Sequence, residues 1–184
     1  MSVAVSPPAR PFVADDLDTM PDDGYRREVI GGALVVTPSP IARHQTCVLE
    51  LAVRLRAVAP ADLEVMLSPF DWRPPTGDSF QPDLMVIRRQ DFDPDGPLRH
   101  TPVLVIEVLS ASNAEQDRAV KRARYQALGV PAYWIVNPVN PDIVALRLGI
   151  GGRYRQVARA GGRHPFRVDV PYPVEIVPAA LIEG

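Results

Sequence analysis

Two carboxylates and one lysine in the middle of the chain are the side chains best suited to chemistry. Asp83 precedes an apolar stretch, Glu107 is the one charged residue in the apolar run Val103–Leu109, and Lys121 follows on a predicted helix. Lys121 is the one lysine among 20 basic residues, since the other 19 are arginine. A lysine carries a compact ammonium that can neutralise a developing oxyanion or orient a water molecule in ways that a guanidinium does not. These three residues are therefore the first candidates for a functional site.

The surroundings of Glu107 predict both a partner and a reaction. Its apolar run is typical of a strand buried on both faces in the middle of a sheet. An isolated buried carboxylate is costly, so Glu107 needs a cation or a proton. Two carboxylates from adjacent strands form the oxygen-rich site that Mg²⁺ or Mn²⁺ prefers. A metal ion can lower the pKa of a bound water, and Lys121 can stabilise charge on a scissile phosphate, which predicts phosphodiester hydrolysis.

A hairpin and a helix are predicted ahead of these residues. Tyr25–Ile30 and Ala33–Thr37 favour two short strands, joined by a pair of glycines that allows the positive φ angles of a tight turn. Glu28 lies within the first strand. Apolar residues at helical spacing then predict a helix over Ile41–Val58, with His44 near its start.

The rest of the chain predicts a sheet and a second helix. The expected strands are Leu63–Pro69, Leu84–Arg88, Val103–Leu109, Ala132–Val136, a hairpin of Ile143–Leu148 with Arg153–Arg159, and one strand with a short final turn in Phe166–Ile182. A helix is expected between the third and fourth of these, ending near Gly129. Asp117, Lys121 and Tyr125 are spaced by four residues, so they share one face of it.

Length and composition indicate one α/β domain. A chain of 184 residues suits a single domain, here 24–184, preceded by a Pro-rich, acidic and partly flexible arm, 1–23. The single cysteine, Cys47, suits a reducing compartment and a buried thiol. No secretory signal or membrane-length apolar run is present, so a cytoplasmic protein with no membrane partner is expected.

The charge distribution limits how the protein could hold nucleic acid. The net charge is −2, and residues 1–24 alone carry −4, so the remainder is close to neutral. This argues against a general nucleic-acid coat and favours a local contact. Arg118, Lys121, Arg122 and Arg124 could form such a patch, although these arginines equally fit a solvated helix face.

Several motifs together are more specific than any single pair of residues. They are Glu28-Val29-Ile30-Gly31-Gly32, His44-Gln45, Gln81-Pro82-Asp83, Val105-Ile106-Glu107-Val108-Leu109-Ser110, Asp117-x-x-x-Lys121-x-x-x-Tyr125 and Gly129-Val130-Pro131-x-Tyr133-Trp134-Ile135-Val136. With these motifs the chain resembles, over roughly residues 24–182, the Uma2 (DUF820) family. That family belongs to the PD-(D/E)XK, restriction-endonuclease-like superfamily.

The resemblance implies a fold and a site. The fold would be a restriction-endonuclease-like central mixed β-sheet flanked by α-helices, with a β-hairpin near each end of the chain. Asp83 and Glu107 would be the ligands of Mg²⁺ or Mn²⁺, and Lys121 the catalytic lysine. The further site candidates are Glu28, His44, Gln81, Asp117 and Tyr125. The implied activity is a metal-dependent endonuclease with DNA as substrate, and a homodimer would suit cleavage of both strands.

The sequence also departs from the pattern of the family. In the superfamily the lysine stands two residues after the glutamate, where this chain has Leu109, so its role would have moved to Lys121 on the helix. Ala33 replaces an acid that family members tend to carry, and Gly31 replaces an aspartate. Two alternatives to the enzyme therefore stay open. One is a catalytically silent nuclease fold that binds nucleic acid or a protein, and the other is a purely structural buried ion network.

Overall fold

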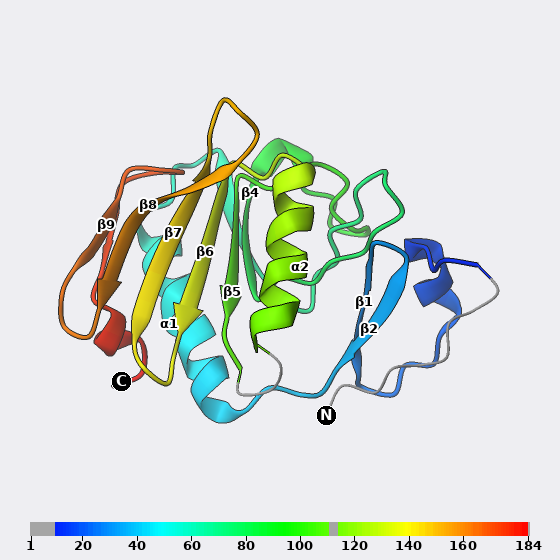
Figure 1. The fold of residues 1–184 in the computed structure, drawn as a ribbon, viewed down its shortest axis with the longest axis horizontal. Coiled ribbons are helices and arrows are strands. Elements are labelled where there is room, and N and C mark those ends of the chain that lie inside the picture. Colours follow the sequence, from blue (N-terminus) through cyan, green and yellow to red (C-terminus); the bar gives the residue numbers. More distant parts are fainter. Residues whose placement is uncertain (1–9, 111–113, 184) are drawn as a thin grey trace.

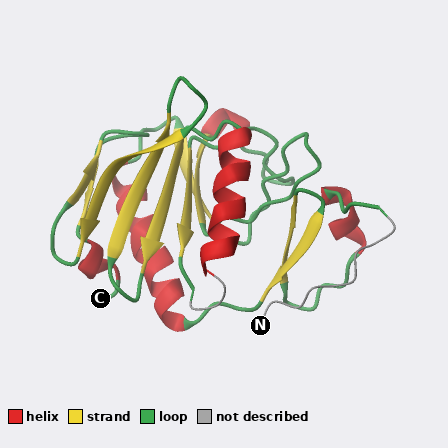
Figure 2. Cartoon of the chain, viewed as in Figure 1, coloured by secondary structure: helices red, strands yellow, loops and turns green. Residues whose placement is uncertain are grey.

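The central feature is a mixed sheet of six strands. The computed structural model describes residues 10–110 and 114–183, and within these every side chain except those of 114–118. In sheet order the strands are β3 (Leu63–Leu67), β4 (Leu84–Arg88), β5 (Leu104–Val108), β6 (Ala132–Asn137), β7 (Asp142–Leu148) and β8 (Tyr154–Gly161). β5 and β6 run parallel and the other neighbours antiparallel. A helix, α2 (Ala114–Ala127), makes the crossover that this parallel pair requires (Figures 1 and 2).

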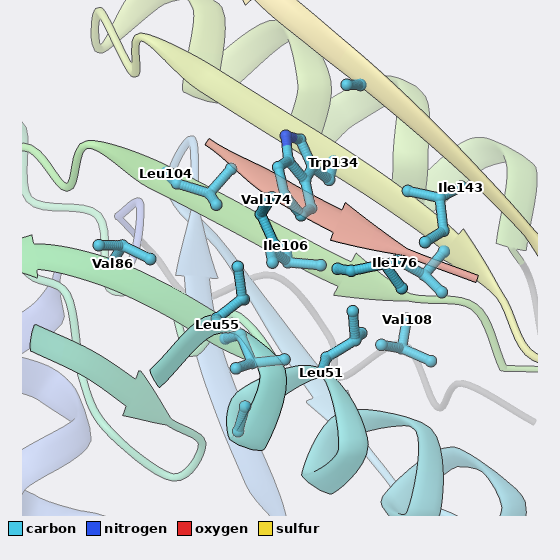
Figure 3. Packing of buried hydrophobic residues seen from close by; sticks show 14 of the residues in the cluster. Leu51, Leu55, Val86, Leu104, Ile106, Val108, Trp134, Ile143, Val174 and Ile176 are labelled. Atoms are coloured by element: carbon cyan, nitrogen blue, oxygen red, sulfur yellow. The ribbon is translucent and has the colours of Figure 1, made fainter. Parts of the chain in front are cut away.

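The two long helices cover opposite faces of the sheet. α1 (Ala42–Val58) lies behind the sheet in Figure 1, and α2 lies in front of β4 and β5. Along β5, Ile106 belongs to the core on the α1 side, which Figure 3 shows, whereas Val105 belongs to the core that contains Tyr125 of α2. Side chains alternate along a strand, so Glu107 faces α2, as Val105 does. All five residues of β5 are buried, as its apolar pattern predicted.

Aromatic rings fill the core on the α2 side. Trp72 lies against Phe80 and Tyr125, with centroid distances of 5.2 and 5.9 Å, and Tyr125 in turn contacts Tyr133 at 5.4 Å. Trp134 lies in the opposite core. Each face therefore contains one of the two tryptophans of the chain.

The predicted N-terminal hairpin is present as a separate two-stranded sheet. β1 (Arg26–Ile30) and β2 (Ala33–Thr37) pair antiparallel across Gly31 and Gly32, whose φ angles of 60° and 83° favour glycine. Val29 exchanges two backbone hydrogen bonds of 2.9 Å with Ser79, just before β4. The hairpin is thus tied to the segment that leads to Asp83. Ahead of it, the short 3₁₀ helix η1 (Ala14–Thr19) donates a backbone bond from Ala14 to Gly77.

The C-terminal segment differs from its prediction. One strand was expected over Phe166–Ile182, but the structure has two, β9 (Phe166–Val168) and β10 (Val174–Ile176), followed by the 3₁₀ helix η3 (Pro178–Leu181). Two prolines, Pro171 and Pro173, interrupt the extended run and create a turn, so the two halves pair antiparallel. The predicted fold class is otherwise confirmed. Among the described residues, no helix has the length and apolar character needed to cross a bilayer.

Candidate active site

The buried carboxylate of Glu107 has two partners from α2. Nζ of Lys121 lies 3.1 Å from Oε1 of Glu107, and the hydroxyl of Tyr125 donates to the same oxygen at 2.7 Å. Lys121 and Tyr125 are one helical turn apart, so α2 directs both side chains at β5. The burial of Glu107 predicted a cation or a proton as its partner, and the structure supplies a cation, Lys121.

Asp83 is fixed at the end of β5 by groups from three elements. Pairing of β4 with β5 places Leu84 opposite Ile106, which brings Asp83 next to the strand end. There the backbone N–H of Val108 donates to Oδ2 of Asp83 at 2.8 Å. Nη1 of Arg26, on β1, donates to Oδ1 at 3.1 Å. Asp83 and Glu107 therefore belong to one cluster, joined through the backbone of Val108.

His44 connects α1 to the same place. Its Nε2 lies 3.1 Å from the carbonyl oxygen of Val108 and 3.3 Å from Oδ2 of Asp83. Both neighbours are acceptors, so Nε2 carries the proton. His44 thus holds Asp83 against the end of β5.

Glu28 is a third acid in the cluster. Its Oε2 lies 2.9 Å from Nζ of Lys121, and its Oε1 accepts a hydrogen bond of 2.9 Å from the backbone N–H of Gln81. Gln81 contributes through its backbone, because its side-chain amide donates to Asp71 at 2.7 Å. Lys121 therefore bridges Glu28 and Glu107.

Burial and charge change the pKa of Glu107. Burial raises it most, and the negative charges of Asp83 and Glu28 raise it further. The ammonium of Lys121 and the guanidinium of Arg26 act in the opposite direction. The pKa of Glu107 is about 7 as a result, so this carboxyl gains or loses its proton near neutral pH.

The pKa values of the neighbouring groups shift in directions that their hydrogen-bond partners, charges and burial explain. Burial alone would raise the pKa of Asp83, but the hydrogen bond from His44 and the charge of Arg26 outweigh it, and the pKa lies below its usual value. Burial alone would lower the pKa of His44, and its bond to Asp83 raises it above the usual value instead. Burial raises the pKa of the Tyr125 hydroxyl well above its usual value, so that group stays a donor.

A groove gives access to the cluster from the Asp83 side. Its volume is about 420 Å³, and its lining includes Arg26, His44, Gln81 and Asp83. Glu107 and Lys121 do not line it and are almost fully buried, with side chains 9% and 3% exposed. A ligand in the groove would therefore meet Asp83 and Arg26 first.

The donor atoms of the cluster fit Mg²⁺ or Mn²⁺ in type. Asp83 and Glu107 offer carboxylate oxygens, and the carbonyl of Val108 lies beside them. Oxygen ligands of this kind suit both ions. In the present arrangement the protein's own cations engage these acids, and among the described side chains no three His, Cys, Asp or Glu groups are arranged as a ready metal cage.

The structure brings together most of the predicted site residues. Asp83, Glu107 and Lys121 lie in one cluster with Glu28, His44 and Tyr125, while Gln81 takes part through its backbone. Asp117 lies on α2, but its side chain is outside the described residues.

The sequence interpretation missed one member of the cluster, Arg26. Strand periodicity was the signal that could have identified Arg26. Arg26 and Glu28 are two residues apart on β1, so their side chains point to the same side of the strand. Among nineteen arginines, nothing else in the sequence distinguished it.

Known proteins provide an independent comparison. Among solved structures, a protein from Anabaena variabilis described as "a putative nuclease belonging to DUF820" superposes with a TM-score of 0.70 at 17% identity. The match covers 94% of this chain and 98% of that one, which shows a shared fold. A comparison with curated proteins found no match. The profile of Uma2, described as "Putative restriction endonuclease", matches residues 14–175, and the chain therefore belongs to the Uma2 family, as its motifs predicted.

Proposed function

We propose that this protein is an endonuclease that requires Mg²⁺ or Mn²⁺ and hydrolyses phosphodiester bonds in DNA. Membership of the Uma2 family and the nuclease fold support nuclease activity in general. The observation that carries the proposal is the contact of 3.1 Å between Lys121 and Glu107, at the strand end where Asp83 is held. A lysine and two acids gathered beside a groove are what phosphodiester hydrolysis needs.

Each side chain has a separate task in this proposal. Asp83 and Glu107 would hold the ion, which supplies Lewis acidity at the scissile phosphate. His44 and the N–H of Val108 keep Asp83 oriented and ionised. Lys121 lowers the pKa of Glu107 and so favours its carboxylate form. Tyr125 fixes the rotamer of Glu107 through its hydroxyl.

The choice of DNA as substrate rests on the groove and on the family. The groove runs beside Asp83 and contains the guanidinium of Arg26, a group that binds phosphate well. A near-neutral surface gives little long-range attraction, so we expect contact to depend on this local site. A homodimer would place two such sites on the two strands of a duplex.

One observation favours the silent alternative. The acids of the cluster already have protein partners, since Lys121 contacts Glu28 and Glu107, and Arg26 contacts Asp83. A buried network of this kind can hold the elements of the fold together without taking part in catalysis. A nuclease fold of that kind would bind nucleic acid or a protein without cutting.

Cleavage assays separate these functions. With plasmid and single-stranded DNA, we expect cleavage in Mg²⁺ and in Mn²⁺ and none in EDTA. Replacing Asp83 with asparagine removes a charged ligand, so we expect Mn²⁺ to bind at least about tenfold more weakly in calorimetry. Cleavage should fall with it.

Asp91 provides a matched control. Asp91 follows the C-terminal end of β4, whereas Asp83 precedes the N-terminal end. Like Asp83, it has an arginine and a histidine nearby, which are Arg88 and His100. Asp91→Asn should leave metal affinity and cleavage unchanged. Cleavage that persists in EDTA would contradict the metal requirement. If no substrate is cut and no metal raises the melting temperature, the silent alternative is the better one.

A further inference from the structure

Arg26 is the cation closest to Asp83, the acid of the cluster that lines the groove. Its Nη1 lies 3.1 Å from Oδ1 of Asp83, and its Nη2 lies 3.6 Å from Oε2 of Glu28. Its charge also interacts with that of Glu107, the remaining acid of the cluster. The guanidinium of Arg26 therefore lies among the carboxylates where a metal ion would bind.

The charges of the cluster explain why a cation is needed there. Glu28, Asp83 and Glu107 are three acids, and the ammonium of Lys121 contacts the first and the last of them. Asp83 is instead paired with Arg26 and His44, and of these two Arg26 carries the permanent charge. The pKa of Arg26 is raised because the attraction of the three acids outweighs its burial. A divalent ion on Asp83 and Glu107 would place further positive charge beside that guanidinium, and the two would repel.

The contacts of Arg26 are incomplete, unlike those of a permanent structural arginine. Among the described residues its Nε is buried without a hydrogen-bond partner, and its distance to Glu28 is too long for a hydrogen bond. It does not form the two-pronged pair with one carboxylate that gives an arginine its strongest binding. Displacing it from Asp83 therefore costs less than breaking a fully bonded pair.

The groove offers open space beside the side chain of Arg26. This side chain is 24% exposed and lines the groove, whereas the side chain of Lys121 is 3% exposed. The guanidinium can leave Asp83 by moving into the groove, without unfolding the hairpin that carries it.

We propose that Arg26 is an internal counter-ion that competes with the divalent cation for Asp83, so that metal binding requires its guanidinium to move away into the groove. This inference rests on the proposed function. It makes Arg26 a residue that sets metal affinity through Asp83, and it accounts for metal-ligating acids that are already paired with cations of the protein.

Metal affinity tests the competition directly. Mn²⁺ is titrated into the full-length protein by calorimetry at pH 8, where Glu107 is largely ionised. We expect Arg26→Met to bind Mn²⁺ at least about tenfold more tightly than the wild type, because two charges about 4 Å apart interact strongly at a partly buried site. Arg26→Gln keeps a donor for Asp83 without the charge, so it serves as a second variant if the first does not fold.

Arg27 provides the matched control, because its guanidinium is next in sequence and contacts Asp23 outside the cluster. Arg27→Met should leave Mn²⁺ affinity unchanged. If Arg27→Met gained as much Mn²⁺ affinity as Arg26→Met, the gain would reflect the net charge of the protein, and the inference would be overturned. If the wild type binds Mn²⁺ and the Arg26 variants bind no more tightly, the inference fails while the proposed function stands. If no protein binds Mn²⁺, both fail. Binding by the variants alone supports the competition.

Discussion

Replacing Lys121 with methionine should lower DNA cleavage at pH 7 by about 10²-fold or more. Methionine keeps most of the length of the side chain and removes its charge. The ammonium contacts Glu28 and Glu107, so its loss leaves two buried acids without their shared cation. The pKa of Glu107, already about 7, then rises further and the carboxyl is neutral at pH 7. Loss of one preorganised electrostatic group from an active site typically has an effect of about this size.

Two comparisons show how Lys121 acts. Arg159→Met removes an exposed charge from β8, outside the cluster and outside the basic face of α2, and should leave cleavage unchanged. Raising the pH to about 9 should restore cleavage in Lys121→Met if the lysine acts only by keeping Glu107 ionised. If the ammonium also stabilises charge on the phosphate, activity stays low at every pH. Cleavage within about threefold of the wild type at pH 7, in the range of a replaceable contact, would contradict the predicted role.

In EDTA, the melting temperature of the wild type should fall as the pH rises from 5 to 8. The pKa of Glu107 is about 7 in the folded protein against a usual value of 4.5, so the folded state holds a proton that the unfolded state releases. The contribution of this proton to the free energy of unfolding is fully present below pH 4.5 and is lost as the pH rises through about 7. The difference corresponds to about 3 kcal/mol, because each pH unit is worth about 1.4 kcal/mol. For a domain of this size we expect a fall of roughly 6–12 °C.

The other titrating groups of the cluster do not cancel this trend. The pKa of His44 is raised by Asp83, so its contribution is also lost with increasing pH, as the pH passes its raised pKa. The pKa of Asp83 is lowered, so its contribution is lost only in acid, below the range measured.

Glu107→Gln is the control for the pH dependence of stability. Glutamine keeps the volume of the side chain and its hydrogen bonds but does not titrate, so its melting temperature should depend on pH much less. Adding Mn²⁺ should raise the melting temperature of the wild type more at pH 8 than at pH 5.5, since metal and proton compete for Glu107. Equal slopes for the wild type and Glu107→Gln would contradict the assignment of the titration to Glu107.

The sequence predicted the elements that have one dominant pattern. An apolar run with one acid identified β5 and the need of Glu107 for a cation or a proton. Spacing by four placed Lys121 and Tyr125 on one face of α2. These inferences work because strand and helix periods act over a few residues. For the C-terminal segment the sequence predicted one strand where the structure has β9 and β10, because the turn between these strands depends on two prolines within an otherwise extended segment.

The contacts that no local pattern predicts are those between distant elements. Arg26 meets Asp83 only because Val29 pairs with Ser79 and brings the hairpin to β4. The bond from Val108 to Asp83 depends on the register of β4 against β5. Such contacts join residues far apart in sequence, and the local patterns of a single sequence carry no signal for them.

The distribution of the aromatic residues gives the protein a built-in optical probe. Trp72 lies against Tyr125, whose hydroxyl donates to Glu107, whereas Trp134 lies across the sheet beside Phe166. In a Trp134→Phe protein, the remaining indole emission comes from the side of the sheet where Glu107 exchanges its proton. Ligand binding at the acids could then be followed by fluorescence without an added dye, and the reciprocal Trp72→Phe protein would report the opposite core as an internal reference.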